Sequence, residues 1–174
     1  MPSDLVSATI RRGLFTRTVG KRLVFFQKIP STMDEAARLA REGTADGTVV
    51  VAETQTSGRG RFDRNWVSPQ GNIYMSVVFR PTIDALPFLS MLAGVATVQT
   101  IRKTTGSSPK IKWPNDVMLG GKKVSGILVE SVMEGDSVCY AVLGIGLNVN
   151  LDPSQNAEIS GIATSLEAVA GKPL

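Results

Sequence analysis

The most constraining feature of the sequence is a pair of long apolar segments, residues 123–133 and 138–148, separated only by turn residues 134–136. A connection this short joins antiparallel strands, because parallel neighbours need a crossover of a dozen or more residues. Two shorter strand-like runs, 110–113 and 117–119, directly precede the pair. We therefore expect an α+β fold with a mixed, mainly antiparallel sheet flanked by helices, and not a doubly wound parallel sheet.

The rest of the chain supplies further strands and helices. Ser31 and Thr32 precede Asp34 and Glu35, which is a signature of a helix N-terminus. Residues 85–104 carry apolar side chains at helical spacing. The expected strands are 23–28, 48–54 and 72–80, and the expected helices are 4–14, 30–42, 85–104 and 157–170. We expect residues 1–174 to form a single domain, which is long enough to bury a core.

Composition excludes several classes of mechanism. The chain has no histidine and one cysteine, Cys139, which excludes Ser-His and Cys-His hydrolysis, histidine-ligated metals and thiolate zinc clusters. Any metal would be a hard cation such as Mg²⁺, held largely by substrate phosphates. A net charge of +4 favours an acidic partner or an anionic ligand.

The same composition sets an expected location. No apolar run approaches the ~18–20 residues of a membrane span, and the N-terminus lacks the apolar region of a secretory signal. We expect a cytoplasmic protein with no membrane partner. In that reducing setting Cys139 is expected to be a small buried residue.

The first candidate site segment is residues 58–66, where glycines alternate with arginines. The backbone can approach a ligand closely, while Arg59 and Arg61 reach its anionic groups. Clustered arginines repel one another without an anion between them, so we expect a loop that is mobile when free and ordered by ligand. Phe62 and Trp66 are expected to pack the ends of the loop. The alternative interpretation is a solvated basic loop.

The second candidate segment brings a lysine, an amide and a carboxylate to a tight turn. Pro114 should hold Trp113 extended, and Trp113 is expected in the core. In the structural interpretation, Lys112 is a surface residue and Asn115 and Asp116 only form the turn. In the functional interpretation, Asn115 positions a ligand and Asp116 lies near a phosphate-bound Mg²⁺.

Two further features mark close approach to the sheet. Lys122 and Lys123 begin a strand, so one should point inward and the other outward, and the inward one should meet Gly126. Gly144 and Gly146 interrupt the last strand, which weakens it unless another group packs closely there.

Taken together, these segments resemble the biotin protein ligases. The resemblance covers about residues 20–150 and rests on order and spacing. Its motifs are Ser31-Thr32 before a helix, Gln55 three residues before Gly58-Arg59-Gly60-Arg61, Lys112-Trp113-Pro114-Asn115-Asp116, residues 123–130, and Gly144-Ile145-Gly146-Leu147-Asn148.

This resemblance implies a biotin/lipoate ligase-like catalytic domain, similar in fold to class II aminoacyl-tRNA synthetases. It implies a two-step reaction in which biotin, as substrate, and MgATP form biotinyl-5′-adenylate. A lysine of the biotin carrier domain of a biotin-dependent carboxylase then takes the biotin.

The resemblance also implies site residues. The biotin and adenylate site would include Ser31, Thr32, Met33, Gln55, Gly58, Arg59, Gly60, Arg61, Lys123 and Gly126. Among these, Arg59, Arg61 and Lys123 would be catalytic, because joining a carboxylate to a phosphate brings two anions together and needs cations between them. Lys112, Asn115, Asp116 and Asn148 would lie beside the phosphates, with Asp116 also the candidate contact for Mg²⁺.

The sequence departs from the family pattern in three places. Met33 stands where the family most often has asparagine. The residues before the first strand are too few for a winged-helix domain, so no specific DNA binding is expected. We expect no C-terminal SH3-like domain of the kind usual in the family, and therefore biotin binding and adenylate formation with slow transfer to the carrier domain. The sequence is compatible with a homodimer and does not decide the oligomeric state.

Three other functions compete with this interpretation. A ligase or transferase for lipoate or another acyl group shares the fold, and only the ring pocket separates it from a biotin ligase. A non-catalytic nucleic-acid-binding module would show a steep salt dependence and no need for ATP. A catalytically weak remnant would still bind biotin.

Overall fold

The computed structural model describes residues 4–62 and 64–172. Its strands are β1 (Leu23–Ile29), β2 (Val49–Gln55), β3 (Ile73–Phe79), β4 (Lys110–Lys112), β5 (Asp116–Leu119), β6 (Lys122–Glu134) and β7 (Ser137–Leu147). Its helices are α1 (Asp4–Arg12), α2 (Thr32–Arg41), α3 (Leu89–Thr105) and α4 (Leu166–Ala170), with 3₁₀ turns η1 (Leu86–Phe88) and η2 (Pro153–Gln155).

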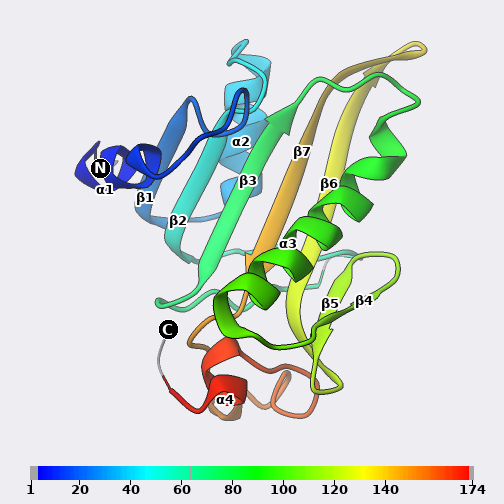
Figure 1. The fold of residues 1–174 in the computed structure, drawn as a ribbon. Coiled ribbons are helices and arrows are strands. Elements are labelled where there is room, and N and C mark those ends of the chain that lie inside the picture. The colour runs from blue at the N-terminus through cyan, green and yellow to red at the C-terminus, as the bar shows by residue number, and fades with distance from the viewer. Residues whose placement is uncertain (1–3, 63, 173–174) are drawn as a thin grey trace.

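The seven strands form one sheet in the order β1-β2-β3-β7-β6-β5-β4 (Figure 1). Only β1 and β2 run parallel, and every other neighbouring pair is antiparallel. The connection between β1 and β2 contains α2, as a parallel crossover requires. The expected mixed, mainly antiparallel sheet flanked by helices is confirmed.

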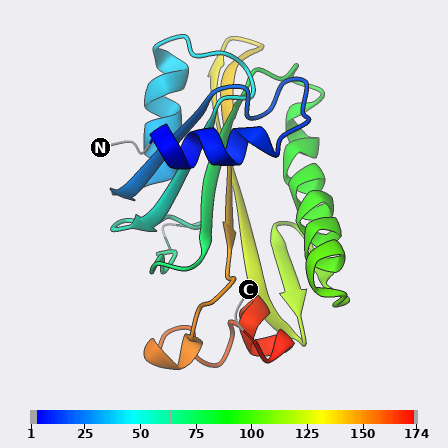
Figure 2. The ribbon, with the colours of Figure 1, turned by 60° about the vertical axis from the view of Figure 1, so that its left-hand side comes forward.

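Helices α2 and α3 cover the two faces of the sheet, as Figures 1 and 2 show. The alternation of β7 explains this arrangement, because successive strand residues face opposite sides. Val142 belongs to the apolar cluster under α2, while Leu143 and Leu147 belong to the cluster under α3. The glycines of β7, at even positions, therefore open on the α2 face.

Helix α2 begins where the sequence predicts. The Ser31 hydroxyl accepts a hydrogen bond from the backbone N–H of Met33 at 3.2 Å, which caps the first turn. Met33, Ala36 and Leu39 are buried at helical spacing against the sheet. Burying a side chain such as Leu39 stabilises the fold by about 1.5–3 kcal/mol. This helix fixes the segment around Thr32 against the centre of the sheet.

The expected helix at 85–104 is present, as η1 followed by α3. It ends at Gly106, whose φ of 71° is the left-handed conformation that favours glycine. Only part of its apolar pattern is buried: Ala93, Val98 and Ile101 pack in the core. Leu89 is also buried, but the other large apolar side chains near the beginning of the helix are exposed, namely Phe88, Met91, Leu92 and Val95.

The expected last helix, residues 157–170, is wrong over most of its length, because only α4 is helical. The preceding segment bonds to β6 instead of to a helix of its own. Lys123 N–H donates to the Ile162 carbonyl and Thr164 N–H donates to the Lys123 carbonyl, both at 2.9 Å. Ser165 then caps α4 by accepting a hydrogen bond from Ala168 N–H at 3.3 Å.

Three predictions of burial are also corrected. Trp113 is 78% exposed, because it lies in the turn after β4, an edge strand whose three residues are all exposed. Phe62 is 79% exposed at the tip of its loop, with a φ of 58°. Cys139 is half-buried beside the α2 cluster. No helix among the described residues is long and apolar enough to cross a membrane.

Candidate active site

Two cross-strand glycines form the floor of the site. Gly126 on β6 pairs directly with Gly146 on β7, and the indole of Trp66 lies over both. A Cβ on Gly146 would lie 2.4 Å from Trp66 Nε1, and one on Gly126 would lie 2.8 Å from Trp66 Cζ3. The close approach expected for these glycines is confirmed, and Trp66 is the group that makes it.

Trp66 holds the end of a small hairpin in the segment between β2 and β3. The backbone N–H of Trp66 donates to the Gly58 carbonyl at 2.9 Å, and the backbone N–H of Gly60 donates to the Arg64 carbonyl at 2.7 Å. The expectation that Trp66 anchors the loop is thus confirmed. We call residues 58–66 the Gly/Arg loop; Asp63 lies outside the described residues. The loop's predicted mobility stays a prediction.

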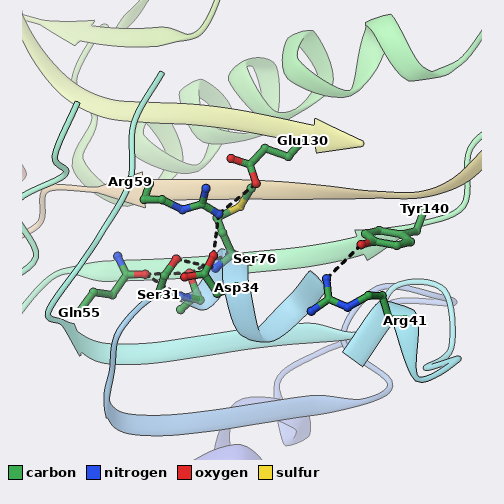
Figure 3. A network of polar contacts seen from close by, with 10 residues as sticks. Ser31, Asp34, Arg41, Gln55, Arg59, Ser76, Glu130 and Tyr140 are labelled. Carbon is green, nitrogen blue, oxygen red and sulfur yellow. Dashed lines mark hydrogen bonds and ion pairs between the residues drawn. The ribbon is translucent and has the colours of Figure 1, made fainter. Parts of the chain in front are cut away.

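An inner pocket lies beneath this loop, on the α2 face. A polar network forms one wall: Gln55 Oε1 accepts from Thr32 N–H at 2.8 Å and from Thr32 Oγ1–H at 3.0 Å, and Ser76 Oγ–H donates to Thr32 Oγ1 at 2.8 Å (Figure 3). Met33 and Leu128 contribute apolar surface. Met33 also fills the space over Gly144, with Sδ 2.6 Å from where a Cβ would stand.

The cavity of the inner pocket measures about 50 Å³. Ordinary ligand pockets measure roughly 300–1,000 Å³. A ligand can enter only if the Gly/Arg loop or the lining side chains move.

Arg59 is paired with two carboxylates of the chain itself, although the clustered arginines were expected to repel one another until an anion lay between them. Its Nη2 lies 2.7 Å from Asp34 Oδ1 and 3.1 Å from Glu130 Oε2 (Figure 3). The two carboxylates offset the repulsion between neighbouring guanidinium groups. Arg59 lines the inner pocket while it makes these contacts.

Asn115 positions the second arginine. Arg61 Nη1–H donates to Asn115 Oδ1 at 3.1 Å, and Asn115 Nδ2–H donates to the Ile127 carbonyl at 3.1 Å. The side-chain amide of Asn115 thus links the loop to β6, with its oxygen bonded to Arg61 and its nitrogen bonded to β6. The guanidinium of Arg61 also lies 4.8 Å from the centre of the Phe62 ring. These contacts place Arg61 at the boundary between the inner pocket and the space beside it.

Lys123 points inward and Lys122 is exposed, as the alternation predicts. Lys123 Nζ lies 2.6 Å from Asp116 Oδ1, and 5.2 Å from the centre of the Trp66 ring. It also lies 3.2 Å from the position of a Cβ on Gly126, so the predicted meeting with Gly126 is confirmed. One ammonium group therefore touches the carboxylate, the aromatic face and the glycine floor.

An outer cavity of about 490 Å³ adjoins the inner pocket. The two spaces share Gly60, Arg61, Trp66, Asn115 and Lys123. The outer cavity is closed on its other side by the segment that replaces the expected last helix, including Ile159 and Ile162. The arrangement is one continuous site of two compartments, with cations at the junction.

The residues do not form a resident metal site. Within the described part of the chain, no group of three or more His, Cys, Asp or Glu residues is placed to hold an ion. Asp116 already pairs with Lys123, so it does not fit as the anchor of a permanently bound cation. The contact between Asp116 and a phosphate-bound Mg²⁺ stays a prediction.

The structure brings most of the predicted residues together in two groups. Around the inner pocket lie Thr32, Met33, Gln55, Arg59, Gly60, Arg61, Lys123 and Gly126. Around the outer cavity lie Lys112, Asn115, Asp116 and Asn148. Ser31 and Gly58 line neither space, since the Ser31 hydroxyl caps α2 and Gly58 packs under Trp66 and Ser68. Asn148 is nearly inaccessible, and its Nδ2–H donates to the Thr164 carbonyl at 3.0 Å.

Several lining residues escaped sequence reasoning. Ile159 and Ile162 fall in a stretch interpreted as helix, so nothing indicated that they close a cavity. Tyr74 lies in a strand recognised only as buried; its hydroxyl donates to the Pro69 carbonyl at 2.8 Å, and burial raises the pKa of its phenol. Trp66 was expected only to anchor the loop, yet its indole also lines both spaces, and its buried Nε1–H has no hydrogen-bond partner among the described residues.

Comparison with known proteins agrees with this geometry. The sequence profile of the Biotin/lipoate A/B protein ligase family matches residues 25–148. The chain is 43% identical to the bifunctional ligase/repressor BirA of Bacillus subtilis over 99% of its own length and 54% of that protein. It is 40% identical to the biotin--[acetyl-CoA-carboxylase] ligase of Paracoccus denitrificans over 82% of its length and 60% of that protein.

Solved structures show the same fold. Biotin protein ligase from Aquifex aeolicus, in complex with biotin and ATP, matches with a TM-score of 0.75 and 34% identity, covering 88% of this chain and 63% of that one. The enzyme from Leishmania major, in complex with biotinyl-5-AMP, matches with a TM-score of 0.70 and 30% identity, covering 87% of this chain and 65% of that one.

This chain belongs to the Biotin/lipoate A/B protein ligase family, and the resemblance read from its motifs is confirmed. It spans about half to three-fifths of the length of the relatives named above.

Proposed function

We propose that this chain activates biotin with ATP to form biotinyl-5′-adenylate and passes the biotin to a lysine of a biotin carrier domain. The observation that carries the proposal is the pair of contiguous compartments with Arg61 and Lys123 at their junction. A reaction that joins a carboxylate to an α-phosphate needs two adjoining anion-binding spaces with cations between them. The names of the relatives support biotin as the acid.

In the first step, biotin occupies the inner pocket with its ring against Thr32 and Gln55, and the buried Ser76 supports Thr32 from behind. This network offers donors and acceptors to a polar ring, while Met33 and Leu128 offer apolar contact. The biotin carboxylate oxygen attacks the α-phosphorus of ATP, a mixed anhydride forms, and pyrophosphate leaves. Holding the two reactants in adjoining spaces supplies much of the rate enhancement.

Arg61 and Lys123 stabilise the charge that develops during this step. With the loop closed, Arg61 is held by Asn115 and Lys123 by Asp116, so these cations need little further reorganisation during the chemical step. Mg²⁺ enters with ATP as part of the substrate. The nucleotide occupies the outer cavity beside Lys112 and Ile162, which has the volume for it.

In the second step, the amine of the carrier lysine attacks the acyl carbon of the adenylate. An amide forms, AMP leaves, and the amine loses a proton. Asp116 is the carboxylate at the junction, and we assign it as the acceptor of that proton. The Gly/Arg loop shields the anhydride from water between the two steps.

The experiment is pyrophosphate exchange into ATP, measured with biotin, with lipoate and with neither acid. Exchange that depends on biotin supports the proposal, whereas exchange that depends on lipoate assigns the chain to the other branch of the family. Absence of exchange with either acid, in a protein shown to be folded, refutes it. Binding to nucleic acid with a steep salt dependence and no requirement for ATP would instead support the non-catalytic alternative.

A further inference from the structure

Two carboxylates from different elements converge on one guanidinium of the Gly/Arg loop. Asp34 belongs to the first turn of α2, and Glu130 lies in the middle of β6. Both contact Arg59 Nη2, at 2.7 Å and 3.1 Å respectively (Figure 3). A residue of the loop is therefore tied at the same point to a helix and to a central strand.

Among the described residues, the pairing leaves other donors of Arg59 without a side-chain partner. Both carboxylates accept from Nη2, and Nε and Nη1 make no side-chain hydrogen bond within residues 4–62 and 64–172. A guanidinium carries five N–H donors in a rigid plane. The two acids therefore hold Arg59 beside the inner pocket through one nitrogen of its guanidinium.

The two anchors belong to fixed parts of the fold. Asp34 follows Met33, which is buried against Gly144 of β7. Glu130 pairs in register with Val142 of β7, a fully buried core residue. When the loop moves, the anchors cannot follow it, so opening the loop breaks both ion pairs.

The strength of the contact suits repeated opening. The side chains are 42% exposed for Arg59, 57% for Asp34 and 42% for Glu130. Ion pairs this exposed contribute little individually and are screened by salt. They bias the loop toward closure but do not lock it, and the small volume of the inner pocket requires the loop or the lining side chains to move when a ligand enters.

We propose that Asp34 and Glu130 are positioning residues that together latch the Gly/Arg loop over the inner pocket through Arg59. Neither acid touches the reacting atoms. The consequence for adenylate retention rests on the proposed function, but the latch is a property of the protein without ligand and can be tested there.

The test uses limited trypsin digestion of the ligand-free protein, with cleavage at Arg59, Arg61 and Arg64 resolved by mass. When the loop opens and closes rapidly, this cleavage follows the population of the open form. Asp34→Asn and Glu130→Gln should each raise it by up to about fivefold, and the double variant should raise it further. Cleavage at Lys21, in a distant exposed segment, is the internal reference and should stay constant.

Matched controls separate the latch from a general loss of acid. Glu42→Gln on the end of α2 and Glu134→Gln on the end of β6 each remove a carboxylate without a contact to Arg59, and should leave loop cleavage unchanged. Asp34→Glu, which keeps the charge, should restore slow cleavage. Raising the ionic strength should speed loop cleavage in the wild-type protein and have little effect on the double variant.

The latch is refuted if the double variant is cleaved within about 1.5-fold of the wild-type rate, well under the expected change, or if salt affects both equally. A second arm measures release of biotinyl-5′-adenylate, which should be faster in the double variant by the same factor as loop opening. If the wild-type chain makes no adenylate, the proposed function fails and the digestion alone decides on the latch.

Discussion

Replacing Gly146 with alanine should disable the site while leaving the fold in place. The new methyl carbon would lie 2.4 Å from Trp66 Nε1 and 2.5 Å from Trp66 Cε2. Comfortable contact between such atoms begins near 3.5 Å, so the indole must move by about 1 Å or more. It cannot settle deeper, because Gly126 lies under its other edge. The ring must lift away from the sheet and carry the end of the Gly/Arg loop with it.

The free-energy cost of Gly146→Ala depends on which part of the protein moves to relieve the clash. Overpacking of this kind costs about 1–3 kcal/mol. A loop end yields more easily than the sheet, so we expect the cost to fall on the closed form of the loop. Affinity for biotin should therefore drop by about 5- to 150-fold, while the free energy of unfolding changes by less than about 1 kcal/mol.

The assay combines calorimetry of biotin binding with tryptophan fluorescence. The chain has two tryptophans, so the emission is recorded in a Trp113→Phe background, where only Trp66 contributes. The emission should shift to longer wavelength as the half-buried indole lifts off the sheet and its inaccessible Nε1 reaches solvent. Gly13→Ala is the matched control, because a Cβ added at Gly13 would lie 3.7 Å from the Ile10 carbonyl oxygen, which is an ordinary van der Waals contact. Unchanged emission with unchanged affinity would show that Trp66 does not pack over Gly146.

Three further changes have defined outcomes. Lys123→Ala should weaken biotin binding by ~1.5–3 kcal/mol, the value of a charge-assisted contact, whereas Lys122→Ala, which removes an exposed neighbour, should leave calorimetric affinity within about twofold. Tyr74→Phe should lower the free energy of unfolding by about 0.5–1.5 kcal/mol in denaturant titrations. Burial raises the pKa of the Tyr74 phenol in the folded protein. The stabilisation by the protonated phenol is therefore complete below the unfolded-state pKa of 10.0 and is lost as the pH rises from there through the raised folded-state pKa. The difference in unfolding free energy between the wild-type protein and Tyr74→Phe should accordingly shrink at high pH. Ser165→Ala removes the cap of α4 and should cost ~0.5–2 kcal/mol in the same titration.

Local sequence signals predicted the elements of the sheet well. The strands at 123–133 and 138–148 are long, apolar and joined by a short turn, so only one pairing was available to them. The capping residue Ser31 placed the start of α2 correctly for a similarly local reason. The last segment failed because its backbone bonds to Lys123, which is about forty residues away and leaves no trace in helical periodicity.

The site was predictable where residue type carries the chemistry. Arginines, lysines and glycines in the Gly/Arg loop and around Lys123 indicated an anion-binding site, and the structure gathers them. The partners of those residues were not predictable. Asp34 and Glu130 resemble ordinary surface acids in sequence, and only the crossing of the loop over β6 and α2 brings both to Arg59. The prediction that Trp113 is in the core was wrong, because it relied on aromatic character, whereas the edge of the sheet offers no core position there.

The backbone contacts of Lys123 have a thermodynamic consequence. Its backbone N–H and carbonyl are bonded to Ile162 and Thr164, which flank Ala163 in the segment that lines the outer cavity, while Lys123 also lines the inner pocket. A ligand that shifts this residue in one compartment must therefore strain or relieve the wall of the other. Linkage then requires reciprocity: whatever factor biotin imposes on the affinity for nucleotide, the nucleotide imposes on the affinity for biotin. Titrating each ligand in the presence and absence of the other would measure that single coupling free energy twice.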